Sequence, residues 1–565
     1  MQMPSDVRFL SSLPVLAATL SLFMLPGAAP AAAGQARIFN IADYGSIPGG
    51  GTLDTAAIQK ALDACGQAGG GIVKVPSGTY LIGTLYLRDN VTLSLEAGAT
   101  LLGSPRIEDY SPHHLIVGKG VKNITLLGPG TIDGQGFLFW SHADARAEAR
   151  QETRTYGWVP QHSWKHNAQN PGDLVVLEHC SGVTISGLAL RNSTSWTLHL
   201  LACDHVRVDG ASIRNRLNGP NTDGIDVQGC QGVQISNCDI CTGDDAIVLK
   251  NRNAQITYPH ACKDVTVANC KLTSPTNGFK IGTESYGDFE NIVFRDSVIQ
   301  AADPDDPLCA DSTPAIPPGH YGNPLGPEAG IAVESVDGAH IRGVLVTNIV
   351  MHGARSPIFI RLGSRGIDPN NKQVKAPTGT ISDVTLSNIV ADGASAPSTI
   401  TGVPGHPVQN ITLSNLQVTN IGNGTTTATA LGLPEKETSY PGALMWGPMP
   451  AHSLFMRHAE GIKLSGLRFT NSRPDTRLAV IADDVAGLAL EGLTLDPVAA
   501  SDPLILLNDV RKSTISGTIP RNTNIWVQVS GSNSADISLA PTGTGRASHV
   551  FALSEGAPAN AVILP

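Results

Sequence analysis

The stretch VQISNCDI, residues 233–240, is followed by a close copy of itself, VTVANCKL, at residues 265–272. In both, apolar residues stand at the first and third positions, a turn-forming residue at the fifth, and apolar residues again beyond it. Further copies begin at residues 183, 206, 292, 384, 411, 462 and 488, and the first five copies are 23 to 32 residues apart. A motif that recurs at variable intervals is typical of stacked coils whose loops absorb the insertions.

The fifth position of the motif is restricted to three residue types. It is glycine, asparagine or aspartate in every copy, at Gly187, Gly210, Asn237, Asn269, Asp296, Asn388, Asn415, Gly466 and Gly492. These residues tolerate a left-handed backbone best. The motif therefore predicts one left-handed bend in each coil.

The composition favours short strands over helices. The chain has 60 glycines, 38 prolines and only 15% charged residues, and a single amphipathic stretch, about residues 55–64, reads as a helix. We predict an all-β fold, a single-stranded right-handed parallel β-helix with a short N-terminal capping helix. Stacking would place Cys238 and Cys270 in one row, more plausibly as buried core thiols than as a functional pair.

The N-terminus resembles a targeting segment. Arg8, the apolar run LPVLAATLSLFMLP and the small residues AAPAAA at 28–33 together predict a signal peptide over residues 1–33. Residues 34–565 are predicted to form one catalytic β-helix domain, with an N-terminal cap over about 36–66 and loop insertions at about 301–329 and 423–450. We expect an exported protein, periplasmic or extracellular, with no membrane span.

The formal charge of −10 argues against nucleic acid as a partner, because phosphate binding requires a basic face. We expect a monomer that needs neither a metal nor another cofactor.

Aspartates are concentrated in two short segments, NTDGID at 221–226 and GDDAI at 243–247. Asp223 and Asp244 are 21 residues apart, so they are predicted to lie on neighbouring coils about 4.8 Å apart, with Asp245 beside them. Mutual repulsion would raise the pKa of at least one carboxyl, as an acid and base pair for glycosidic cleavage with inversion requires. A single such motif could equally cap a turn, but two of them one coil apart favour catalysis.

These motifs carry a family resemblance. GPNTDGID (219–226), CTGDDAIVLKN (241–251) and SWTLH (195–199) resemble glycoside hydrolase family 28, the polygalacturonase family. The resemblance implies a β-helix cleft in which Asp244 is the general acid and Asp223 and Asp245 hold and deprotonate the attacking water. It also implies that Asn221 contacts substrate.

Two segments depart from the family pattern. In TNGFKIGTES (276–285), Asn277 stands where the family usually has histidine, and GIAVESVDG (330–338) has Ala332 and Glu334 where an Arg-Ile-Lys pair grips a uronate. Strand alternation directs Lys280 and Arg361 away from the core, where they could line a groove with Glu334 or simply be solvated.

The expected activity is that of an exported inverting hydrolase acting on pectic polysaccharides or oligosaccharides, including rhamnogalacturonan or side chains. The two loop insertions favour action on chain ends. Trp196 is a candidate stacking platform for a sugar, although a core tryptophan is an equal alternative. A polysaccharide lyase and a catalytically lapsed carbohydrate-binding β-helix are the competing functions.

Overall fold

The computed structural model describes residues 37–111, 113–142, 164–252, 261–307, 325–366, 375–422, 424, 431–495, 503–520, 523–542, 547–554 and 556–564. The predicted signal peptide at 1–33 and residue Cys309 lie outside this part of the chain.

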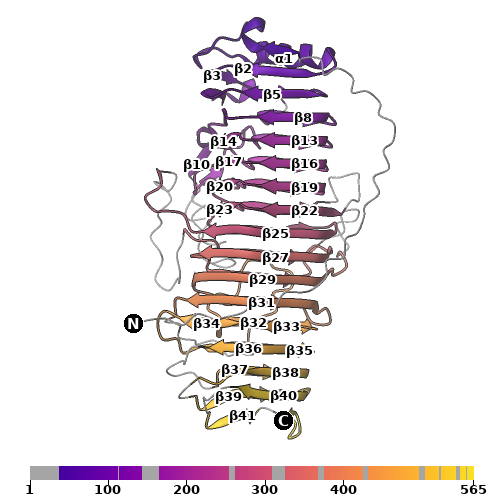
Figure 1. Cartoon of the computed structure of the whole chain (residues 1–565), viewed down its shortest axis with the longest axis vertical. Helices are drawn as coiled ribbons and strands as arrows, with labels where there is room; N and C mark the ends of the chain where they lie inside the picture. The colour runs from indigo at the N-terminus through magenta and orange to yellow at the C-terminus, as the bar shows by residue number, and fades with distance from the viewer. Residues whose placement is uncertain are drawn as a thin grey trace, which may run out of the picture. The chain divides into compact units, whose positions relative to one another are not determined.

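The strands stack along the chain, as Figure 1 shows, and their parallel pairings form three ladders. The first ladder carries the site and comprises β4 (Leu85–Tyr86), β7 (Ile116–Lys119), β12 (Val175–Glu178), β15 (Leu198–Leu201), β18 (Ile225–Gln228), β21 (Ile247–Asn251), β24 (Asn277–Ser285), β26 (Ala329–Ser335), β28 (Ser356–Leu362), β30 (Ser398–Thr401), β32 (Ala451–Glu460), β35 (Leu478–Ala486), β37 (Ile505–Asn508), β39 (Ile525–Ser530) and β41 (His549–Leu553).

The second ladder contains the repeated motif. Its members are β1 (Ile38–Asn40), β2 (Gly71–Val75), β5 (Val91–Leu95), β8 (Lys122–Leu127), β13 (Ser181–Ser186), β16 (Asp204–Asp209), β19 (Gln231–Ser236), β22 (Cys262–Ala268), β25 (Phe289–Gln300), β27 (His340–His352), β29 (Thr380–Ala394), β31 (Val408–Asn420), β33 (Lys463–Ser465), β36 (Ala489–Leu495), β38 (Arg511–Thr518), β40 (Ala535–Thr542) and β42 (Val562–Ile563).

The third ladder is shorter and merges with the second. It contains β3 (Gly78–Ile82), β6 (Ala99–Gly103), β9 (Thr131–Asp133), β14 (Ala189–Arg191), β17 (Ser212–Arg214), β20 (Asp239–Cys241) and β23 (Lys271–Thr273). Beyond β23 the long strand β25 turns the corner and pairs with both β22 and β23. The strand β34 (Arg468–Asn471) resumes the ladder. The predicted parallel β-helix is confirmed.

The predicted bends are confirmed at all nine positions. Each fifth-position residue has a positive φ, between 52° and 68°. The sequence analysis missed one copy, VLVTNIVM at 344–351, whose Asn348 has a φ of 57°. Its side-chain amide donates to Asp296 Oδ1 at 2.9 Å, and Asn388 donates to Asn348 Oδ1 at 3.1 Å. Stacked polar side chains thus connect successive bends along the outside.

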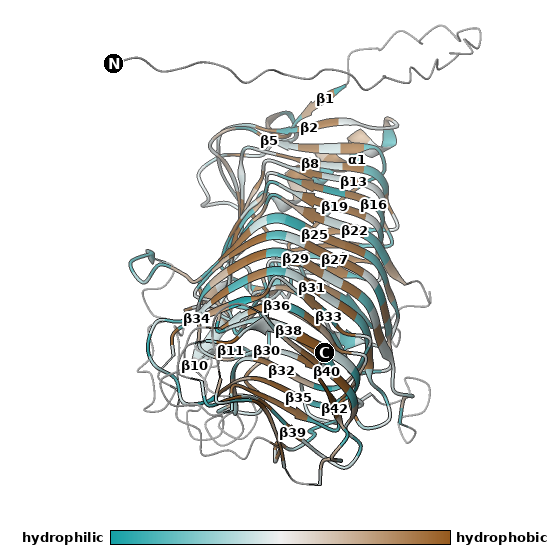
Figure 2. Cartoon of the chain, turned by 60° about the horizontal axis from the view of Figure 1, so that its bottom comes forward, coloured by the Kyte–Doolittle hydropathy of each residue, from teal (hydrophilic) through white to brown (hydrophobic). Residues whose placement is uncertain are grey.

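The core runs through the interior of the coils. Figure 2 shows hydrophobic residues recurring at matching places from one strand to the next. Cys238 and Cys270 are both buried, as predicted for core thiols, and all eight cysteines among the described residues are free and buried. A second thiol row, missed by the sequence analysis, contains Cys180, Cys203 and Cys230.

One α-helix, α1 (Thr55–Gln67), caps the first coil, three residues longer than predicted at its C-terminal end. It buries Ile58, Leu62 and Cys65 against the start of the stack. Short 3-10 helices occur at η1 (Ile41–Tyr44), η2 (Ile107–Asp109) and η3 (Gly136–Phe139), and β10 (Trp140–His142) pairs antiparallel with β11 (Trp164–His166). Within the described ranges, no helix has the length and apolarity needed to cross a membrane.

The two predicted loop insertions contain no complete strand where they are described. In the first, residues 301–307 and 325–328 contain no strand, β26 begins at Ala329, and residues 308–324 lie outside the described chain. The 431–450 segment runs between β31 and β32 without a strand. This 431–450 segment covers side chains of the first ladder near the candidate site.

Candidate active site

The two aspartate motifs lie immediately before neighbouring strands of the first ladder. Asp223 precedes β18, and Asp244 and Asp245 precede β21. The glycines in these motifs allow close packing of the coils, because a Cβ on Gly224 would lie 2.4 Å from the Ala246 carbonyl oxygen. The Gly224 N–H in turn donates to the Asp245 carbonyl at 2.9 Å. Gly224 thus allows the turn that carries Asp223 to stack directly on the turn that carries Asp244 and Asp245.

The register between these coils is 22 residues. Ile225 pairs with Ile247, which aligns Asp223 with Asp245 and leaves Asp244 in the turn before them. Carboxylate oxygens of the three aspartates lie within 4.8 Å of one another. The structure therefore places Asp223 beside Asp244 and Asp245 on neighbouring coils, as predicted.

Asp244 is the most exposed of the three aspartates and has no ion pair within the described structure. Its carboxylate accepts the Asp245 N–H at 2.9 Å and the Asn221 side-chain amide at 3.4 Å. Burial, followed by the charges of Asp223 and Asp245, raises the pKa of Asp244 well above its ordinary value. The shift favours the protonated form of Asp244, as a general acid requires.

Asp223 is 2% exposed and is paired with a lysine. Its Oδ2 lies 3.1 Å from Lys250 Nζ, while its Oδ1 has no hydrogen-bond partner among the described residues. Burial raises the pKa of Asp223 to about 6, against the opposing charge of Lys250. This carboxylate is ionised above that pH and has one oxygen available for another donor.

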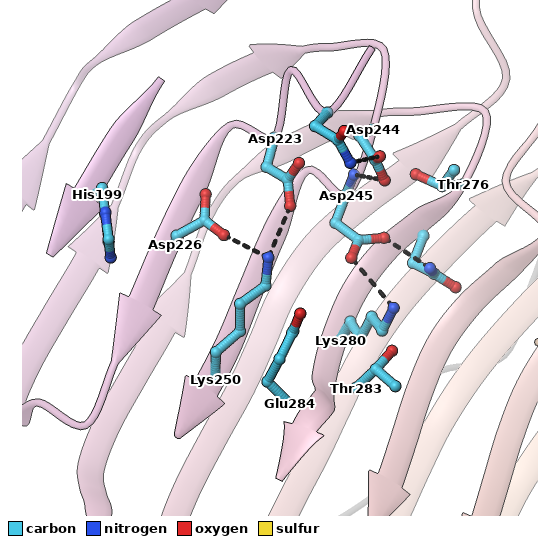
Figure 3. A network of polar contacts seen from close by, with 12 residues as sticks. His199, Asp223, Asp226, Asp244, Asp245, Lys250, Thr276, Lys280, Thr283 and Glu284 are labelled. Carbon is cyan, nitrogen blue, oxygen red and sulfur yellow. Dashed lines mark hydrogen bonds and ion pairs between the residues drawn. The ribbon is translucent and has the colours of Figure 1, made fainter. Parts of the chain in front are cut away.

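Asp245 is 4% exposed and is held from the next coil. Asn277 donates its side-chain amide to Asp245 Oδ1 at 2.6 Å, and Lys280 Nζ lies 3.2 Å from Oδ2. Figure 3 shows the two lysines approaching Asp223 and Asp245 from separate positions. Each of these two aspartates therefore has its own ammonium partner, whereas Asp244 has none.

The predicted substrate contacts at Lys280 and Glu334 are buried within the protein. They lie 3.8 Å apart, and Thr283 donates its hydroxyl to the same Glu334 oxygen at 3.1 Å. Burial raises the pKa of Glu334 to about 7, although Lys280 opposes the shift. Lys280 points away from the core, as alternation predicted. Neither Lys280 nor Glu334 lines an open groove or is solvated, because both side chains are buried.

Arg361 does not join the aspartates, contrary to the prediction. It donates to the Gly402 carbonyl at 3.1 Å and to the Glu435 carbonyl at 2.6 Å. Its guanidinium also lies over the Trp446 ring at 5.3 Å. Arg361 thus anchors the 431–450 segment, part of a predicted loop insertion whose contact with Arg361 was not anticipated.

The 431–450 segment also reaches the aspartate cluster. Thr283 Oγ1 lies 3.1 Å from the Tyr440 hydroxyl oxygen, and the Tyr440 ring lies 5.8 Å from Lys280 Nζ. Further along, the Leu444 N–H donates to the buried Glu328 carboxylate at 3.0 Å. The segment therefore borders the site on the side of Lys280.

Trp196 is half-buried at the opposite border of the site. Lys250 Nζ lies 3.8 Å from the centre of its ring, and the His199 ring contacts it edge-on at 4.8 Å. The indole is therefore neither a core tryptophan nor an open platform, because an ammonium group occupies a face of the ring.

Sequence reasoning missed two residues inside the motifs it quoted. NTDGID contains Asp226, which is fully buried in β18, and CTGDDAIVLKN contains Lys250 in β21. Lys250 Nζ lies 2.8 Å from Asp226 Oδ1. Both residues sit at outward positions of their strands, and that alternation was the signal available to find them.

The aspartate cluster has the composition of a possible cation site. Asp223, Asp244 and Asp245 could each offer one oxygen to a divalent ion. Lys250 and Lys280 already place two positive charges against this cluster, which weakens its attraction for a metal. The arrangement is better suited to proton transfer, with one proton-bearing carboxyl beside two lysine-paired carboxylates.

Comparison with known proteins agrees with this geometry. The model of "Glycosyl hydrolases family 28" matches residues 65–262, which include all three aspartates. A "Probable polygalacturonase" of Vitis vinifera is 25% identical over 411 residues, covering 68% of this chain and 74% of that protein. Over residues 65–262 the chain is similar to glycoside hydrolase family 28. It is polygalacturonase-like, and this similarity favours hydrolysis over the lyase and binding alternatives.

A second relative is an "Exo-poly-alpha-D-galacturonosidase" of Dickeya chrysanthemi, 27% identical over 334 residues, covering 51% of this chain and 54% of that protein. The solved family 28 exopolygalacturonase of Yersinia enterocolitica matches with a TM-score of 0.54 at 20% identity, over 82% of this chain and 78% of that one. At this identity the structural match supports the shared β-helix fold.

Proposed function

We propose that this hydrolase cleaves glycosidic bonds of pectic polysaccharides or oligosaccharides by a single displacement with inversion. Asp244 is the general acid, and Asp223 and Asp245 hold and deprotonate the water. The observation that carries the proposal is the charge asymmetry: Asp244 has a raised pKa and no ion pair within the described chain, while each of the other two has a lysine.

The reaction balances with these three groups. Asp244 donates its proton to the leaving glycosidic oxygen as the bond between that oxygen and the anomeric carbon breaks. Water attacks the anomeric carbon from the opposite side and gives its proton to Asp223 or Asp245. The unpartnered Oδ1 of Asp223 is an acceptor for that water.

Inversion requires its own test. Inverting glycosidases usually hold their carboxyl groups roughly 6.5–9.5 Å apart, and retaining enzymes about 5–5.5 Å. The facing oxygens of the three aspartates lie within 4.8 Å of one another, a distance between single atoms that does not decide between the two. We favour inversion because Asp223 and Asp245 are both lysine-paired carboxylates that can accept a proton from water, and because the family resemblance implies it. Proton NMR of the first product formed will show an inverted anomer, and a retained anomer would contradict this step.

The sugar at the cleavage point is proposed to be neutral, such as rhamnose or a branched side-chain residue. Lys250 and Lys280 are the cations nearest the aspartates, and both are committed to carboxylates. Glu334 adds a further acidic group beside Lys280. Neither lysine is therefore free to bind a uronate, whereas hydroxyl groups can bond to carboxylates.

Chromatography of products identifies the substrate. The mature protein and its Asp244→Asn variant are incubated with homogalacturonan, rhamnogalacturonan and side-chain pectic oligosaccharides. We expect a saturated product from rhamnogalacturonan or a side-chain substrate, absent with the variant. Release from homogalacturonan alone would contradict the neutral-sugar proposal.

Action on chain ends is a separate proposal, supported by the two loop insertions and by the position of the 431–450 segment, whose Tyr440 lies beside Lys280. An exo-acting enzyme releases one short product from the start of the reaction. A ladder of intermediate sizes would contradict it, and so would an unchanged product pattern after truncation of residues 305–325.

We also propose that the chain is exported, because residues 1–33 have a targeting pattern. We further propose that it is a monomer. Fractionation of cells expressing the whole chain should recover a protein beginning near Gly34 in the periplasm or medium, and light scattering should give a single-chain mass. An intact N-terminus in the cytoplasm would contradict export, and a dimer mass would contradict the monomer.

A further inference from the structure

Lys250 bridges two aspartates beneath the site. Its ammonium lies 3.1 Å from Asp223 Oδ2 and 2.8 Å from Asp226 Oδ1. The side chains of Lys250, Asp223 and Asp226 are 6%, 3% and 0% exposed. Figure 3 shows Lys250 extending along β21 to reach both carboxylates.

The ammonium group is enclosed by protein on a third side. The Trp196 ring centre lies 3.8 Å from Lys250 Nζ. A cation over an indole is stabilised by the ring while being shielded from water. With two carboxylates and an indole around it, Lys250 has little room to bind a sugar, so its influence on the reaction passes through Asp223.

We propose that Lys250 and Asp226 are positioning residues: Lys250 orients Asp223 and keeps it ionised, and Asp226 holds Lys250 in place. This inference rests on the proposed function, in which Asp223 receives the proton of the attacking water.

The charges around the bridge support this division of roles. Burial is the main cause that raises the pKa of Asp223 to about 6, and Lys250 is the main charge that opposes it. Burial, followed by the charge of Asp223, raises the pKa of Asp226 well above its ordinary value. Protonation of Asp226, which this shift favours, would leave more of the positive charge of Lys250 to Asp223.

Neighbouring elements present other charged or titratable groups to this bridge. They are Asp173 before β12, His199 in β15, Asp244 and Asp245 before β21, Arg252 after it, and Lys280 and Glu284 in β24. Lys250 itself is in contact with both Asp223 and Asp226.

The test compares Lys250→Met, Lys250→Arg and Asp226→Asn with the unmodified enzyme. Lys271→Met is the matched control, because Lys271 is an exposed lysine in β23 of the third ladder. Two readouts are used: the pH profiles of kcat and KM on the hydrolysed glycan, and infrared titration of carboxyl groups, which needs no substrate. Circular dichroism confirms that each variant is folded.

In Lys250→Met, loss of the opposing cation raises the pKa of Asp223, so the acid limb of the kcat profile moves to higher pH. We expect kcat at pH 6 to fall about 100-fold with KM within about twofold, since misplacing a reacting group can cost that much. The carboxyl that titrates near 6 should move upward in the infrared titration. Lys250→Arg should restore most of both properties, and Lys271→Met should change neither.

Asp226→Asn keeps an oxygen acceptor for Lys250 and removes a carboxyl that competes for its charge. The acid limb should therefore stay in place or move to lower pH. A shift to higher pH, as in Lys250→Met, would overturn the role of Asp226. A raised KM with an unchanged acid limb in Lys250→Met and Lys250→Arg would show instead that Lys250 binds substrate.

The two readouts separate this inference from the proposed function. Hydrolysis by the unmodified enzyme with no infrared shift in Lys250→Met overturns the positioning role and leaves the function standing. An infrared shift without hydrolysis of any glycan overturns the function, and with it the catalytic part of the inference.

Discussion

The two lysines of the site perform the same pairing in different surroundings. Lys250 binds Asp223 and Asp226 from the coil before it and lies against Trp196. Lys280 binds Asp245 at 3.2 Å and Glu334 at 3.8 Å, one residue from each neighbouring coil. The Lys250 side is assembled from one short stretch of sequence, whereas the Lys280 side depends on a distant segment that covers it. Similar lysine–carboxylate ion pairs can therefore be buried either by residues close in the sequence or by a distant segment.

Removing the carboxyl between the two lysine sides has the largest expected effect. Asp244→Asn should lower kcat on the natural glycan by about 10²- to 10⁴-fold, because the leaving oxygen loses its proton donor. Steady-state kinetics on the identified substrate measures the loss. Asp204→Asn, an exposed change on β16, is the control and should retain full activity. Activity within tenfold of the original in Asp244→Asn would contradict the assignment.

The Lys280 side contains a carboxyl that costs stability when ionised. Glu334 has its pKa raised to about 7 by burial, so the folded state binds its proton more tightly than the unfolded state does. Stability is therefore fully present below the ordinary pKa of a glutamate and falls as pH rises toward 7. Glu334→Gln should gain on the order of 3 kcal/mol relative to the original between pH 5 and pH 8.

Urea unfolding of both proteins at the two pH values measures this gain, which corresponds to roughly a hundredfold change in the folding equilibrium. A gain that is equal at pH 5 and pH 8 would mean that Glu334 does not titrate in this range.

Replacing each lysine by methionine should move opposite limbs of the pH profile. Lys250 is the nearer opposing charge for Asp223, whereas Lys280 exerts the stronger lowering influence on the pKa of Asp244. Lys280→Met should therefore raise the pKa of Asp244 further and extend the basic limb to higher pH, with a loss in kcat of about tenfold. Identical shifts of the pH profile in Lys280→Met and Lys250→Met would contradict the claim that the two lysines act on different carboxyls.

The smallest effect is expected at Trp196. Trp196→Phe keeps a ring near Lys250 but weakens the contact, which is worth about 0.5–2 kcal/mol for a tryptophan. We expect a few-fold fall in kcat with KM unchanged. A large rise in KM with kcat preserved would show that the indole stacks on the sugar, as the sequence analysis considered.

The repeated motif made the fold readable from sequence because each bend depends on one residue type at one position. Asn237 and Asn269 adopt left-handed backbones for local steric reasons, so no distant contact was needed to predict them. The meeting of Asp223 with Asp244 and Asp245 was predictable too, because residues about one coil apart stack on neighbouring coils.

The segment that covers an outward side chain could not be predicted from the repeated motif. Alternation correctly turned Lys280 and Arg361 away from the core, but it carries no information about the 431–450 segment that buries Arg361. Asp226 and Lys250 were missed for a related reason, since their pairing follows from the stacking of two strands and not from either motif alone.

The most direct test of the central claim compares glycosides with good and poor leaving groups in three variants. The claim is that Asp244 supplies the proton while Asp223 and Asp245 activate water. An activated aryl glycoside of the identified sugar needs no proton on its leaving oxygen, so Asp244→Asn should recover most of its lost activity on that substrate. Asp223→Asn and Asp245→Asn should remain inactive on both substrates. Recovery in Asp223→Asn or Asp245→Asn, with none in Asp244→Asn, would contradict the account.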